Sequence, residues 1–66
     1  MTLMWADVQE IAIQLAEQKP DVDPRYVNFV ELHRWVTGLP EFADSPQRGG
    51  EKVLEAIQAA WIEEAD

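Results

Sequence analysis

Apolar side chains recur at helical spacing in three separate stretches of this 66-residue chain. In the first stretch they occupy positions i, i+3, i+4 and i+7, the pattern of an amphipathic helix with one buried face. The residues of this stripe are Val8, Ile11, Ala12 and Leu15. The spacing predicts a helix that begins after Asp7 and ends near Gln18. Asp7, followed by Glu10 three residues later, resembles a capping box.

The second stretch shows the same spacing in its last part and is ambiguous in its first part. Its regular stripe consists of Leu32, Trp35, Val36 and Leu39. Residues 24–39 form either one helix or a short turn followed by a helix, and the segment from Val27 to Val30 also suits a brief extended piece. Gly38 and Pro40 end the pattern, because glycine permits a left-handed cap and proline cannot continue a helix.

The third stretch predicts a helix from Glu51 to the end of the chain. Its stripe consists of Val53, Leu54, Ile57 and Trp61. Residues 40–50 form a loop before it, because they combine two prolines with the pair Gly49-Gly50, which we expect to act as a hinge. The whole pattern predicts a mainly α, compact three-helix single domain over residues 1–66, with at most very short strands.

Two prolines enclose two carboxylates between the first and second stretches, in the run Pro20-Asp21-Val22-Asp23-Pro24. Asp23 is a candidate N-cap for the segment that Pro24 opens, and Asp21 then remains as a solvated turn residue. An EF-hand calcium loop is excluded, since Arg25 and Tyr26 stand where a third oxygen ligand and a glycine would be needed. Loose binding of a hard cation by the two carboxylates is the alternative to this structural interpretation.

His33 is the only histidine, and the chain has no cysteine. Transition-metal sites in proteins combine several such donors, and a lone histidine beside an apolar stripe is more often a hydrogen-bonded, partly buried side chain. The lack of cysteine also excludes disulfides and a thiolate-bound cluster.

Thirteen acidic residues against five basic ones give the chain a net charge of -8. Such a field repels nucleic acid and anionic membranes, and it attracts cations and basic protein surfaces. No lysine or arginine precedes Lys19 or follows Lys52, so both ends of the chain are purely anionic. No apolar run approaches the ~20 residues of a membrane span, and the first residues lack the basic start of a signal peptide. We therefore expect a cytoplasmic protein with no membrane partner.

Motifs from one end of the chain to the other occur in the order and spacing of one known family. They are Leu3, Trp5 and Asp7, then Glu10-Ile11, Pro20 to Pro24, Phe29, Glu31, His33 and Trp35, Phe42, Asp44, Pro46-Gln47, Glu51 to Ile57, Trp61 and Glu64-Ala65. Together they resemble the IscX family, the small acidic proteins of the bacterial iron–sulfur cluster assembly machinery. The chain departs from that family at Gly38, where relatives often carry aspartate, and at Ala43 and Ser45, which interrupt a run of aspartates.

The resemblance implies a fold similar to a winged helix, a non-enzymatic role and no tightly bound cofactor. It also implies weak binding of ferrous or ferric iron by surface carboxylates, and docking of a monomer on the cysteine desulfurase IscS to modulate sulfur transfer. For the ion we expect Asp21, Asp23 and Glu31, with Asp7 and Glu10 as further candidates. The residues that we expect to contact the partner are Asp21, Asp23, Glu31, Glu41, Asp44, Glu63 and Glu64.

Two other classes of function are less well supported by the sequence. A winged-helix protein that binds nucleic acid needs a basic face, and only five lysine and arginine residues could form one. An enzyme that uses paired carboxylates needs a concave pocket in which their pKa values differ, and a chain of this length leaves little room for such a pocket.

Overall fold

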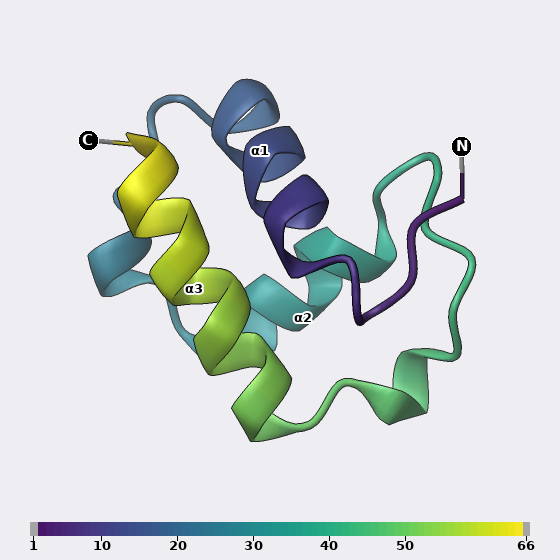
Figure 1. The fold of residues 1–66 in the computed structure, drawn as a ribbon. Helices are drawn as coiled ribbons and strands as arrows, with labels where there is room; N and C mark the ends of the chain where they lie inside the picture. The colour runs from purple at the N-terminus through teal and green to yellow at the C-terminus, as the bar shows by residue number, and fades with distance from the viewer. Residues whose placement is uncertain (1, 66) are drawn as a thin grey trace.

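The computed structural model describes residues 2–65, and over this range three α-helices and two short 3-10 helices follow one another along the chain. Their bounds are Val8–Gln18 for α1, Pro24–Tyr26 for η1, Phe29–Thr37 for α2, Pro46–Arg48 for η2 and Glu51–Ala65 for α3. α1 and α3 form the most extensive helix pair, and α2 packs against them from behind (Figure 1). The predicted mainly α, three-helix architecture is confirmed.

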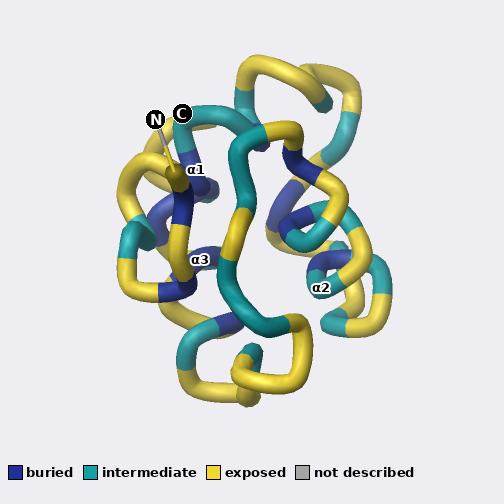
Figure 2. The backbone as a smooth tube through the Cα atoms, turned by 90° about the vertical axis from the view of Figure 1, so that its right-hand side faces the viewer, coloured by how far each residue is buried: buried dark blue, intermediate teal, exposed yellow. Residues whose placement is uncertain are grey.

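The hydrophobic core lies where the three helices meet the N-terminal segment. Its buried members are Leu3, Trp5, Ile11, Ala12, Leu15, Leu32, Val36, Leu39, Leu54, Ile57, Ala60 and Trp61. Buried and exposed stretches alternate along each helix (Figure 2), as expected of amphipathic helices with one face inward. The core contains no polar or charged residue among those described. None of the helices between residues 2 and 65 is long and apolar enough to cross a membrane.

The second stretch divides into a 3-10 turn and a helix, which answers the question that its pattern left open. Asp23 accepts a hydrogen bond from the backbone N–H of Arg25 (3.0 Å) and so caps η1, as predicted. α2 has its own cap in Asn28, whose side-chain oxygen accepts from the N–H of Glu31 (2.8 Å). Val27 between the two helices is extended.

Two local predictions are wrong. Asp7 does precede α1, but its carboxylate accepts no hydrogen bond from that helix; it accepts from the N–H of Met4 instead (2.9 Å), so the capping box is not formed. Gly38 ends α2 with φ -87° and ψ -3°, which is right-handed backbone that other residues also adopt. The Asp7 carboxylate is taken up by Met4, and at Gly38 the backbone N–H donates to the carbonyls of Arg34 and Val36.

The N-terminal segment pairs with the long loop that precedes α3. The N–H of Leu3 donates to the carbonyl of Glu41 (2.7 Å), and the N–H of Ala43 donates to the carbonyl of Leu3 (2.9 Å). This isolated parallel bridge, which joins Leu3 to Phe42, is the only β pairing between residues 2 and 65. It agrees with the expectation of at most very short strands.

Trp5 fastens this loop to the rest of the molecule. Its indole N–H donates to the carbonyl of Ser45 (2.8 Å), and its backbone N–H donates to a carboxylate oxygen of Asp44 (3.1 Å). Phe42 meets the indole edge-on with ring centroids 4.9 Å apart. Gly49 lies so close to the same ring that a Cβ there would overlap three of its carbon atoms. Gly49 of the predicted hinge is therefore a close-packing position, whereas Gly50 faces open space, and Trp5 is buried.

His33 supports the same loop from α2. Its ring centroid lies 5.4 Å from that of Trp5, and its Nε2 lies 2.7 Å from the carbonyl oxygen of Pro46. Because a carbonyl oxygen can only accept, Nε2 carries the proton in this contact. His33 is thus the hydrogen-bonded, partly buried side chain that the sequence favoured.

Asp44 is part of the same arrangement. Its carboxylate accepts hydrogen bonds from the N–H groups of Trp5 (3.1 Å) and Ser45 (2.7 Å), with the guanidinium of Arg48 3.8 Å away. Its side chain is only 11% exposed. These hydrogen bonds, helped by the charge of Arg48, hold the pKa of the Asp44 carboxyl below its ordinary value of 3.8.

The close packing of Gly49 on Trp5 can be tested with a pair of serine variants. Gly49→Ser should lower the free energy of unfolding by about 1–3 kcal/mol, because the added Cβ forces the indole away from its hydrogen bond to Ser45. Gly50→Ser is the matched control, since Gly50 faces open space and directly precedes α3, where serine is favoured. Urea unfolding followed by tryptophan fluorescence measures both. Equal stability of the two variants would contradict the close contact.

The hydrogen bonds to Asp44 predict a pH dependence of stability. Because the folded-state pKa of Asp44 is lowered, its contribution is complete above the ordinary value of 3.8 and is lost as pH falls through the folded-state pKa. Asp44→Asn should therefore be less stable than the native chain near pH 7, with a difference that shrinks below pH 3.8. Asp21→Asn is the matched control, because it removes the same charge from an exposed carboxylate outside this arrangement of hydrogen bonds. Thermal unfolding by circular dichroism between about pH 2 and 7 checks this.

Candidate functional site

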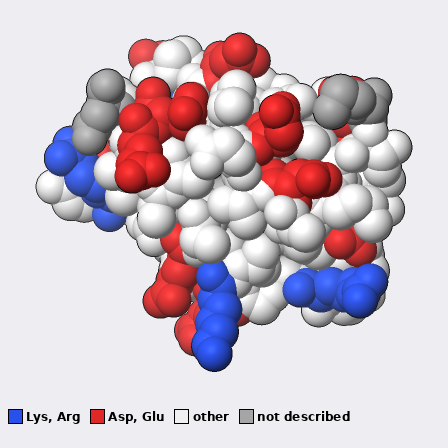
Figure 3. Space-filling view, in the orientation of Figure 1, with Lys and Arg blue, Asp and Glu red and all other residues white. Residues whose placement is uncertain are grey.

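The outer side of α1 and the adjoining end of α3 carry acidic residues and no basic ones. We call this surface the α1–α3 face and define it by the exposed residues Glu10, Glu17, Glu63 and Glu64. The two helices adjoin there, since the amide of Gln9 donates to Glu64 across a distance of 3.4 Å. Acidic side chains are spread over much of this view of the molecule, whereas basic ones lie at its left edge and along its bottom (Figure 3). The acidic patches in this view are separated by uncharged side chains.

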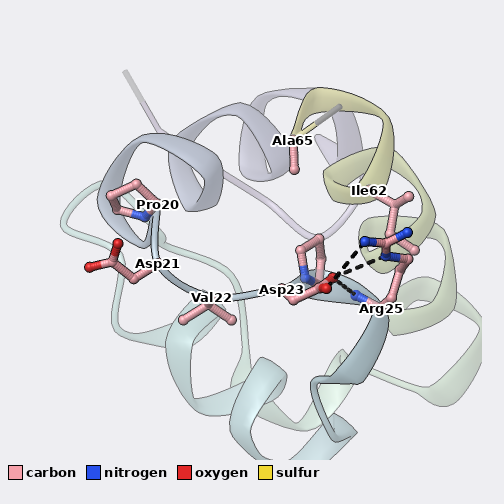
Figure 4. Close-up of a pocket in the computed structure, with 8 residues that line it drawn as sticks. Pro20, Asp21, Val22, Asp23, Arg25, Ile62 and Ala65 are labelled. Carbon is pink, nitrogen blue, oxygen red and sulfur yellow. Dashed lines mark hydrogen bonds and ion pairs between the residues drawn. The ribbon is translucent and has the colours of Figure 1, made fainter.

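The loop with the two predicted carboxylates lies at one end of this face. Pro24 is buried, and its carbonyl accepts a hydrogen bond from the side-chain amide of Gln58 on α3 (2.8 Å), so the loop is held against that helix. A pocket of about 240 Å³ separates the loop from the last turn of α3, where Ala65 lines it. Asp21 and Asp23 both border this pocket, but their carboxylates point in different directions (Figure 4).

Asp23 is already bound by its neighbour. Nε and Nη2 of Arg25 donate to its two carboxylate oxygens (3.2 and 3.3 Å), in addition to the backbone hydrogen bond that caps η1. The side-chain and backbone hydrogen bonds from Arg25 lower the pKa of the Asp23 carboxyl. Asp23 therefore stays ionised at neutral pH, and any other ligand must compete with a guanidinium for it.

A second hollow, of about 440 Å³, lies on the other side of η1, beside α2. Asp23 and Glu31 both border it, together with the aromatic side chains of Tyr26 and Trp35 and with Asn28. Of the five carboxylates expected to bind an ion, these two are the pair that share this hollow. Asp21 borders only the first pocket.

The five metal candidates do not come together in one site. Across residues 2–65, no group of three or more histidine, cysteine, aspartate or glutamate side chains could hold a metal ion. Asp7 accepts a hydrogen bond from the backbone N–H of Met4, ahead of α1, and Glu10 lies exposed on the α1–α3 face. These donors suit only loose contact with a hydrated cation, because a fixed site needs more oxygen ligands around one centre.

The partner candidates fall into groups that differ in exposure. Glu63 and Glu64 belong to the exposed α1–α3 face, and Asp21 lies exposed in the loop beside the end of α3. Glu41 is half-buried and accepts a hydrogen bond from the side-chain amide of Gln14 (3.5 Å). Asp44 is largely covered and holds the loop at Trp5, so its charge is the least accessible of the set.

Most of the basic side chains contact groups of their own chain. Lys19 lies over the ring of Trp35, Arg25 bonds Asp23, Arg34 lies near Glu31, and Arg48 lies near Asp44. They come from different segments and form no continuous basic stripe over the face in Figure 3. The arrangement does not favour the nucleic-acid alternative, which needs such a stripe.

Sequence reasoning missed three residues that shape these surfaces. Gln58 lies on the helix that packs against the loop, but nothing in its local pattern marks it as the donor to Pro24. Asn28 was overlooked as a cap, although asparagine three residues before Glu31 was a usable signal. Tyr26 is a large side chain that the sequence offers for the core, but it is 83% exposed beside the second hollow.

Comparisons with known proteins bear on the function of this surface. A curated but uncharacterized protein of Pseudomonas aeruginosa is 77% identical over 66 residues, which cover 100% of both chains. A family model described as iron-sulphur cluster assembly matches residues 3–66. The match takes in the N-terminal segment, all three helices and the carboxylate loop, and it therefore shows that this chain belongs to the IscX family of iron–sulphur cluster assembly proteins.

Proposed function

We propose that this protein is a non-enzymatic adaptor of iron–sulphur cluster assembly in the cytoplasm, which docks on a cysteine desulfurase and modulates its delivery of sulfur. Membership of the family indicates that the protein takes part in iron–sulphur cluster assembly. The observation that carries the docking is the α1–α3 face, where α1 and the last turn of α3 carry exposed carboxylates and no lysine or arginine. Lys19, just beyond α1, borders a hollow with Glu64 and lies over the ring of Trp35.

Electrostatic attraction explains how such a face would act. A net charge of -8 on a body of 66 residues produces a field that steers a basic partner toward the densest group of carboxylates. Surface charges of this kind set encounter rate and orientation more than affinity, and salt screens them over about 8 Å at physiological ionic strength. An adaptor that must bind and leave an enzyme suits this regime.

Two carboxylates with lowered pKa values have structural rather than catalytic surroundings. General acids among carboxylates have raised pKa values, because burial or a like charge disfavours ionisation. The pKa values of Asp23 and Asp44 are instead lowered by hydrogen bonds, and each of these residues holds a local structure in place. Both behave as structural anions rather than as proton donors.

Iron is the second part of the proposal, as a weakly held ion rather than a resident cofactor. Hard oxygen donors suit a labile ferrous or ferric ion. The described residues do not build a closed site, so the ion would keep most of its water and exchange readily. Asp21 and Glu31 are the best candidates, because Arg25 already occupies Asp23.

Charge reversal tests the docking. Asp21→Lys should raise the Kd for a cysteine desulfurase about 3- to 10-fold at low salt, and the difference should shrink at about 0.5 M salt. Glu51→Lys is the matched control: it makes the same change in net charge at the opposite end of α3 and should have a smaller effect. Biolayer interferometry across a salt series measures both. Equal effects of the two variants would reduce the interaction to net charge.

An anaerobic titration with ferrous iron, followed residue by residue by NMR, tests the metal proposal. The signals of residues 20–24 and 28–32 should change first, with a dissociation constant of about 10⁻⁴–10⁻³ M, the range of carboxylate sites with few ligands. Asp21→Asn should remove the response in the first segment and leave the second. Equal changes at Glu51 and Glu55, which are exposed elsewhere on α3, would mean nonspecific attraction by charge.

A further inference from the structure

The most exposed large hydrophobic side chain of the described residues borders a hollow. Tyr26 is 83% exposed, more than Val30 at 72% or Met4 at 39%. Single exposed apolar side chains are ordinary on protein surfaces. Tyr26 differs because it stands at the rim of the hollow of about 440 Å³, across from the half-buried ring of Trp35.

Two carboxylates, those of Asp23 and Glu31, are among the polar groups around this hollow. Glu31 borders it, and the nearest guanidinium nitrogen of Arg34 is 3.9 Å from its Oε2, which is beyond hydrogen-bond distance. The Glu31 carboxylate therefore keeps acceptor capacity toward the hollow. Asp23 adds a second negative charge at the rim, although Arg25 already binds both of its oxygens.

The aromatic wall already attracts a cation of the same chain. The ammonium nitrogen of Lys19 lies 4.9 Å from the centroid of the Trp35 ring, within the range of a cation–π interaction. Trp35 thus already holds a cation of its own chain, which leaves Tyr26 as the exposed aromatic surface of the hollow. Aromatic faces combined with a carboxylate make up the chemistry that proteins use to bind organic cations.

We propose that this hollow receives an arginine side chain of the basic partner, with the guanidinium plane stacked on Tyr26 and its N–H groups directed to Glu31. Arginine fits better than lysine, because its planar fork can stack on a ring and bond a carboxylate through two nitrogens at once. The inference rests on the proposed function and adds to it one anchoring contact, away from the diffuse charge of the α1–α3 face.

A peptide tests the hollow without the partner. Titration of the native chain with Gly-Arg-Gly, followed by NMR, should give saturable shifts at Tyr26, Glu31 and the Trp35 indole. Gly-citrulline-Gly, which has nearly the same shape and no charge, should give none. Tyr26→Ala and Glu31→Gln should each abolish the shifts, and Val30→Ala should keep them. Equal responses to both peptides, or no response to either, would overturn the proposal.

The partner tests whether the contact is used. Tyr26→Ala and Glu31→Gln should each raise the Kd for the cysteine desulfurase about 5- to 10-fold, while Val30→Ala and Glu51→Gln stay within about 2-fold. Both test variants should fold, because the Tyr26 side chain is exposed and the α2 cap uses only the backbone N–H of Glu31.

The peptide titration and the desulfurase measurement together distinguish this inference from the proposed docking function. If the native chain does not bind the desulfurase but the arginine peptide still binds selectively, the docking function fails and the hollow as an arginine site is supported. If the native chain binds the desulfurase and both variants bind equally well, the hollow is not the anchor and this inference is wrong.

Discussion

The packing of Trp5 is the interaction on which the remainder of the structure depends. The N-terminal segment and the loop before α3 are far apart in sequence, and neither has enough regular structure to hold its place alone. The indole joins them through its hydrogen bond to Ser45 and its contact with Gly49, while His33 brings α2 to the same point. Because so small a domain buries limited surface, one large aromatic side chain at such a junction supplies a large share of the apolar burial that stabilises the fold.

The apolar core decides where the charges can lie. Burial of an unpaired charge is costly, and the described core contains none, so the carboxylates occupy the surface. Some of them have structural duties there: Asp44 holds the loop, and Asp23 caps η1. Glu63 and Glu64 lie in the last turn of α3, where carboxylates oppose the helix dipole. Glu64 also accepts a hydrogen bond from Gln9 of α1.

The molecule has two kinds of charged surface. The α1–α3 face carries several exposed carboxylates, which suits rapid and reversible encounter with a basic enzyme. The hollow beside Tyr26 and Trp35 offers shape and charge together, which suits one specific side chain. No group of three or more described carboxylates converges on one centre, so the iron contact that we propose is a weak one. A family member in iron–sulphur cluster assembly could combine these properties as an adaptor.

The sequence by itself determined the three helices, the cap at Asp23, the acidic character and the family, since each depends on spacing, composition or motif order within the chain. Only the tertiary structure decided which residues meet. In the folded chain Trp5 packs on Gly49, and Asp44 accepts a hydrogen bond from the backbone N–H of Trp5. The carboxylates of Asp21 and Asp23 point in different directions. Tyr26 and Glu31 border the same hollow. These outcomes depend on packing between segments that local periodicity does not encode, and for that reason the sequence indicated carboxylate chemistry without showing which carboxylates act together.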